Sequence, residues 1–264
     1  MTLSETSINF KQFIESCNKL NNSDKGIGND LDNIDNIKDW KMYDITLDDK
    51  NFKLLGEKID YSLIYRKLKG NGNTIFVIPG YSDKSIYWTV GRMNRFIKDY
   101  PNIFNQYREL YIINLQNTKP IQENIVNKSE NKSEKREEFD NQIANHINKI
   151  INSLKKNITL LGRSAGGGQA IRVSILNDNI KSLFLASPGH KKSGFEEYLK
   201  TSKKIPIVLS YVEQDTRIKK EEIYKMKDQM HDNLYTPFTF LSINSNKIGN
   251  NHNHRFQPEL IKML

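Results

Sequence analysis

The chain has 264 residues, of which 37% are hydrophobic, and a formal net charge of +9. This length can bury a substantial core and favours one large domain. Its only cysteine, Cys17, excludes an intramolecular disulfide and a cysteine-rich metal cluster, and no stretch of about 18 apolar residues marks a membrane span.

The positive charge is spread along the sequence. Basic residues are interleaved with acids and asparagines, as in NKSENKSEKREE, so we expect a solvated surface and no specific nucleic-acid partner. The first residues, MTLSETSINF, lack the basic start and apolar core of a secretory signal. We therefore expect a cytoplasmic protein without a transmembrane segment, and the oligomeric state stays open.

The first 36 residues are expected to form a separate N-terminal part. Apolar residues recur there at helical spacing and predict an amphipathic helix: Phe10, Phe13, Ile14, Cys17 and Leu20. The following stretch, NNSDKGIGNDLDNIDN, has the composition of a polar linker. The main domain is predicted to span residues 37–264.

Short apolar runs dominate the chain from Trp40 onward, including TIFVIPG, ELYIINL, NITLLG, SLFLASPG and IPIVLSYV. Most of the later runs are separated by segments compatible with helices, at 83–100, 138–154 and 220–231. This alternation predicts an α/β fold, a three-layer α/β/α sandwich with a mostly parallel central sheet. Residues 117–137 are polar and poor in aromatics, and are predicted to form a surface loop.

Glycines surround one serine in LLGRSAGGGQAI, at residues 160–171, between a predicted strand and a helix-compatible run. Three interpretations compete: a nucleophile elbow, a phosphate-binding loop, and a tight connection without chemistry. A Walker loop needs Lys followed by Ser or Thr, but this chain has Gln169 and Ala170 there. Gly162, Ser164 and Gly166 match G-x-S-x-G, which favours the elbow.

A serine nucleophile needs a histidine base and a carboxylate that orients the base, here in the order serine, acid, histidine. Asp215 follows the strand-like run IPIVLSYV, and His252 and His254 precede a short terminal helix. The spacing alone leaves both histidines open. His190 is a weaker candidate, whereas His146 and His231 lie in polar helical segments and are expected at the surface.

These motifs resemble the α/β-hydrolase superfamily from about residue 40 to the end of the chain. The resemblance rests on VIPGYS, GRSAGG, VEQDTRI and GNNH. The terminal G-x-x-H pattern favours His252 as base over His254, and the acid-loop pattern selects Asp215 although Val212 replaces a glycine. The resemblance also implies an oxyanion hole from the backbone N–H groups of Tyr81 and Ala165, although Pro79 replaces a histidine common in relatives.

The expected activity is that of a serine hydrolase that cleaves an ester, thioester or related acyl bond of a small molecule. This chemistry requires neither a metal nor an organic cofactor. Tyr87 and Trp88 are candidate pocket residues, and the short segment between SLFLASPG and IPIVLSYV predicts little or no lid. The alternative is a catalytically inactive protein with the same fold that binds partners through its basic surface.

Overall fold

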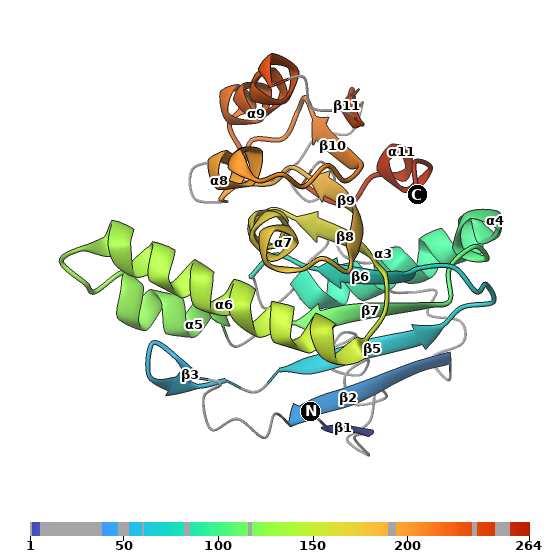
Figure 1. The fold of residues 1–264 in the computed structure, drawn as a ribbon, viewed down its shortest axis with the longest axis horizontal. Coiled ribbons are helices and arrows are strands. Elements are labelled where there is room, and N and C mark those ends of the chain that lie inside the picture. The colour runs from blue at the N-terminus through green and yellow to red at the C-terminus, as the bar shows by residue number, and fades with distance from the viewer. Residues whose placement is uncertain are drawn as a thin grey trace.

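The computed structural model describes residues 2–5, 39–46, 53–59, 61–81, 85–115, 118–189, 194–233, 237–245 and 254–264. Within these ranges nine strands form one sheet in the order β1-β2-β5-β7-β6-β8-β9-β10-β11 (Figure 1), beside a small β3–β4 hairpin. The strands are β1 (Thr2–Glu5), β2 (Trp40–Thr46), β3 (Lys53–Leu54), β4 (Glu57–Lys58), β5 (Ser62–Lys67), β6 (Thr74–Ile78), β7 (Glu109–Asn114), β8 (Ile158–Arg163), β9 (Ile180–Ala186), β10 (Ile207–Val212) and β11 (Phe238–Ile243).

Six neighbouring strands, from β7 to β11 in the sheet order, run parallel to one another. β1, β2 and β5 add an antiparallel edge. The carboxyl ends of the parallel strands therefore meet at one edge of the sheet, where reactive groups gather in open α/β folds. The loops at this edge carry Tyr81, Ser164 and Asp215.

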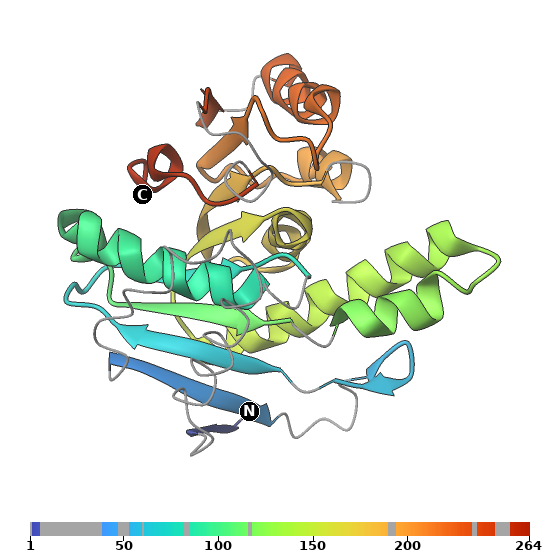
Figure 2. The same cartoon turned by 180° about the vertical axis from the view of Figure 1, so that it is seen from behind.

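Helices cover both faces of the sheet (Figures 1 and 2). α6, α7, α8 and α9 supply apolar side chains to the core on one face, and α3, α4 and α11 supply the core on the other. The helices are α3 (Ser85–Asp99), α4 (Pro101–Phe104), α5 (Thr118–Ile121), α6 (Lys132–Leu154), α7 (Ala165–Leu176), α8 (Phe195–Lys200), α9 (Lys220–Asp232) and α11 (Pro258–Ile261). The predicted three-layer sandwich with a mostly parallel sheet is confirmed.

The strand β6 shows how the sequence builds these layers. All five of its residues are buried. Phe76 and Ile78 face the core under α6 and α7, whereas Ile75 and Val77 face the core under α3. A strand covered on both sides favours apolar residues on both faces, which explains the run IFVI. Thr74 at the start of the strand donates its hydroxyl to Glu109 at 3.1 Å.

The prediction of a surface loop at 117–137 is wrong for most of these residues. α5 begins at Thr118 and continues into a π-helical segment, Gln122–Val126, and α6 begins at Lys132. Thr118 and Val126 are buried, and Ile121 packs against the main core. These few inward-facing residues hold the segment on the domain, although its outward-facing residues give it the composition of a loop.

The amphipathic helix expected near the N-terminus falls on residues outside the described ranges. Of the predicted N-terminal part, the structure describes residues 2–5, which pair with β2 as the edge strand β1. None of the helices in the described ranges is long and apolar enough to cross a membrane.

Candidate active site

The turn between β8 and α7 holds Ser164 in an unusual backbone conformation, with φ 55° and ψ −126°. A positive φ is sterically costly for a residue with a side chain. Hydrogen bonds fix the turn: Ser164 N donates to Ala186 O of β9 at 3.0 Å, and Ser164 O accepts from Gly167 N at 2.9 Å. The serine is only partly buried, so a sharp, well-anchored turn presents it at the edge of the sheet.

Close packing explains the glycines on both sides of the serine. A Cβ atom on Gly166 would lie 2.2 Å from the carbonyl oxygens of both Ile78 and Pro79, and one on Gly162 would lie 2.6 Å from Gly166 O. Real Cβ atoms do not approach backbone atoms this closely. The helix that follows Ser164 can therefore pack against the end of β6 only with glycine at position 166, and against β8 only with glycine at position 162.

Asp215 and His254 form a buried pair at the same edge. Asp215 lies just after β10, and its Oδ2 is 2.7 Å from His254 Nδ1. Because the carboxylate only accepts, Nδ1 carries the proton and Nε2 keeps its lone pair when the ring is neutral. The other carboxylate oxygen, Oδ1, accepts from Arg217 N at 2.9 Å. This arrangement orients the imidazole and leaves Nε2 able to accept a proton.

Burial and neighbouring charges act in opposite directions on this pair. Burial by itself raises the pKa of Asp215, but hydrogen bonds and charge from His254, together with Arg217 N and the Ser187 hydroxyl, lower that pKa overall. Burial lowers the pKa of His254, Asp215 raises it, and the charges of Arg163 and Arg217 lower it further. The net effect favours an ionised carboxylate beside a neutral imidazole.

Arg163 links the serine turn to the histidine segment. Its fully buried guanidinium donates from Nη1 to His254 O at 2.6 Å. Burial lowers the pKa of Arg163 to about 10, and the charges of Arg255 and Arg217 contribute in the same direction. The arginine is still cationic at neutral pH. Since Arg163 directly precedes Ser164, this bond brings the backbone of His254 beside the serine turn.

The two proposed oxyanion donors lie on neighbouring segments. Ala165 is the first residue of α7, where backbone N–H groups have no acceptor within the helix. Tyr81 follows β6 and the Pro79–Gly80 turn, and Gly166 packs against the start of this turn. The geometry places these two segments in contact, as an oxyanion hole requires.

The other candidate residues have different environments. Trp88 is partly buried on α3, with the Arg255 guanidinium 5.3 Å from its ring centroid. It therefore packs against the residue that follows His254. The Tyr87 side chain, His190 and His252 lie outside the described part of the chain.

The expectation that His146 lies at the surface is wrong, whereas His231 is exposed as expected. His146 Nδ1 lies 3.0 Å from the hydroxyl of Tyr61. Burial, helped by the charge of Lys149, lowers the pKa of His146 to about 4. This histidine is a neutral partner in the core beneath α6.

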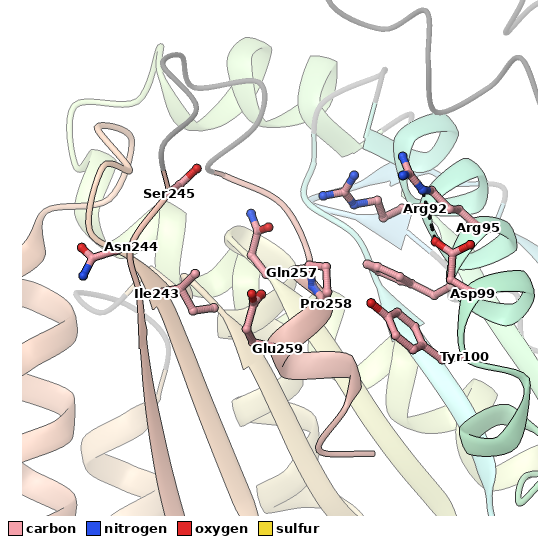
Figure 3. A pocket seen from close by; sticks show the side chains of 11 residues that line it. Arg92, Arg95, Asp99, Tyr100, Ile243, Asn244, Ser245, Gln257, Pro258 and Glu259 are labelled. Carbon is pink, nitrogen blue, oxygen red and sulfur yellow. Dashed lines mark hydrogen bonds and ion pairs between the residues drawn. The ribbon is translucent and has the colours of Figure 1, made fainter.

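A cavity of about 360 Å³ lies between the second half of α3, the end of β11 and the start of α11 (Figure 3). Charges on its α3 wall are engaged within the fold: Arg95 pairs with Asp99 at 3.3 Å, and Arg92 Nε donates to Phe256 O at 3.2 Å. Because the start of α11 lines the cavity, the cavity borders the segment that follows His254.

Among the described residues, no group of three or more His, Cys, Asp or Glu is arranged to hold a metal ion.

No family model and no curated protein matches this chain. Among solved structures, dienelactone hydrolase from Anabaena variabilis is similar with a TM-score of 0.53 and 12% identity, over 85% of this chain and 93% of that chain. The BES protein from Bacillus cereus is similar with a TM-score of 0.51 and 13% identity, over 79% of this chain and 89% of that chain. The chain has the α/β-hydrolase fold.

The packing at the serine turn predicts that Gly166→Ala lowers the free energy of unfolding by about 3 kcal/mol, because the added methyl must displace backbone carbonyls. Gly189→Ala is the matched control, since no described atom lies within 4 Å of its Cβ position. Its effect should be within about 0.5 kcal/mol. Urea denaturation measures both, and equal effects would contradict the packing account.

The environment of His254 predicts a ring that titrates below the ordinary histidine pKa of about 6.5. Titration followed by NMR, with the signal assigned through His254→Ala, measures this midpoint. Asp215→Asn should lower it further, because the carboxylate favours the protonated ring. A midpoint above the ordinary value would show that Asp215 outweighs burial and the nearby arginines.

Proposed function

We propose that the protein is a serine hydrolase that cleaves an ester, thioester or related acyl bond through Ser164, His254 and Asp215. The observation that carries the proposal is the buried Asp215–His254 pair, tied through Arg163 to the strained turn that presents Ser164. A neutral imidazole held by a carboxylate is what a serine hydroxyl needs to become a nucleophile.

In the proposed reaction, Ser164 Oγ attacks the carbonyl carbon of the substrate while its proton moves to His254 Nε2. The negative charge that develops on the carbonyl oxygen is held by the N–H groups of Ala165 and Tyr81. Collapse of this intermediate breaks the acyl bond, and the leaving alcohol, thiol or amine takes the proton from His254. An acyl-Ser164 ester remains.

Water completes the cycle in a second half-reaction, in which water is the nucleophile and Ser164 is the leaving group. His254 takes a proton from water as it attacks the acyl-Ser164 carbonyl, and then returns the proton to Ser164 Oγ as the acid product leaves. Asp215 stays ionised and stabilises the imidazolium in both halves. The residues named supply every proton transfer.

His254 is proposed as the base in place of His252, which the terminal sequence pattern favoured. The support is the 2.7 Å contact between His254 and Asp215. His252 lies outside the described residues. The two histidines are two positions apart, so both candidates lie in the terminal segment that the sequence pattern indicated.

Ser164→Ala should lower kcat/KM for a short-chain aryl ester by about 10³-fold or more, because only oxyanion and binding contributions remain. His254→Ala should cause a comparable loss. The neighbouring His252→Ala is the matched control and should retain activity within about 3-fold, an effect below 1 kcal/mol.

Circular dichroism and thermal unfolding of each variant show whether a loss of activity reflects a loss of fold. Near-normal turnover by Ser164→Ala would remove the proposed nucleophile. Loss of activity in His252→Ala with retention in His254→Ala would move the base to His252 and leave the serine assignment standing.

A further inference from the structure

The side chain of Tyr81 reaches away from the sheet edge into a buried polar cluster. Its hydroxyl accepts from Gln169 Nε2 at 2.5 Å and donates to Asp140 Oδ1 at 3.2 Å. The ring also packs edge-on against Phe139, with centroids 5.9 Å apart. Two helices, α6 and α7, therefore hold the side chain of a residue whose backbone lies at the proposed oxyanion site.

The three side chains form one hydrogen-bonded cluster. Gln169 Nε2 lies 3.3 Å from the same carboxylate oxygen, Asp140 Oδ1, that receives the tyrosine proton. Asp140 Oδ2 lies 3.7 Å from Arg136 Nε, one helical turn earlier on α6. Tyr81, Gln169 and Asp140 are all buried, and among the described residues Gln169 Oε1 is a buried acceptor without a hydrogen-bond partner.

Packing alone does not explain why polar groups occupy this buried position. Buried polar groups cost free energy unless they are hydrogen-bonded, and an apolar ring of similar volume avoids this cost. Burial, with the charge of Asp140 adding to it, raises the pKa of Tyr81 well above its usual range. The hydroxyl therefore keeps its proton for Asp140. The cluster fixes the orientation of the Tyr81 ring, because hydrogen bonds are directional and apolar contacts are not.

The position of Gln169 explains why a fixed Tyr81 ring matters for the proposed reaction. Gln169 lies on α7, four residues after Ala165, so its bond to Tyr81 ties together the two segments that carry the proposed oxyanion donors. Donors of this kind must lie about 2.7–3.1 Å from the developing oxyanion. A small displacement of one segment relative to the other weakens this contact in the transition state.

We propose that the Tyr81 hydroxyl, Gln169 and Asp140 are positioning groups that fix the backbone N–H of Tyr81 relative to that of Ala165. The proposal rests on the proposed function, because it concerns the oxyanion site of that reaction. None of the three side chains is required to touch the substrate. Their loss should therefore impair the chemical step and leave substrate binding intact.

Tyr81→Phe tests this with the ring kept in place. In ester hydrolysis, kcat should fall about 10-fold, less than the roughly 10²–10³-fold loss of a complete donor, with KM changed by less than about 2-fold. The rate of reaction with a fluorophosphonate should fall in parallel, because that reaction also places negative charge in the oxyanion site. Gln169→Met, which removes the donor to Tyr81 at similar volume, should show the same pattern.

Tyr61→Phe is the matched control, because Tyr61 is also a buried tyrosine whose hydroxyl contacts a side chain of α6, at His146. Tyr61→Phe should lower the melting temperature by a few degrees, as Tyr81→Phe should, and leave kcat unchanged. The pH midpoint of kcat/KM should be the same in Tyr81→Phe as in the unmodified protein, since the Asp215–His254 pair is untouched.

The outcomes separate the two proposals. If the unmodified protein is active and Tyr81→Phe has the same kcat as Tyr61→Phe, the positioning role is wrong and the serine-hydrolase proposal stands. A change in KM without a change in kcat also overturns it. If the unmodified protein neither hydrolyses esters nor reacts with the fluorophosphonate, the proposed function fails and this inference fails with it.

Discussion

The contact between the β8–α7 turn and the end of β6 is the constraint on which the rest of the site depends. It holds Ser164 at a positive φ and leaves no room for a side chain at Gly166. Backbone strain of this kind persists only where surrounding structure enforces it, and it gathers at functional sites. Here the enforcement comes from the hydrogen bond between Ser164 N and Ala186 O of β9 and from close packing against the carbonyls of Ile78 and Pro79.

The parallel sheet converts this local constraint into a site. Because β6, β8 and β10 run in the same direction, the residues after each of them meet at one edge. Tyr81 follows the first strand, Ser164 the second and Asp215 the third. Arg163 then joins the serine turn to His254 through a buried hydrogen bond. The strands and this hydrogen bond thus bring the four residues to the same edge of the sheet.

Much of this fold could be predicted from the sequence, because buried parallel strands favour nearly continuous apolar runs such as TIFVI and ITLL. Ser164 and Asp215 could be named as candidates because glycine spacing and strand ends are local signals. The environment of His146 and the fold of residues 117–137 could not, because they depend on a few side chains that meet distant partners. The same holds for Arg163, whose acceptor on His254 is 91 residues away, and for the pairing of Asp215 with His254.

We propose that the fold activates one serine among all those in the chain. Reaction of the folded protein with a fluorophosphonate, followed by proteolysis and mass spectrometry, is the decisive test, because the reagent marks the activated hydroxyl regardless of the natural substrate. We expect a single adduct, on Ser164, that is absent after heat unfolding. An adduct on another residue, or none on the folded protein, would contradict it.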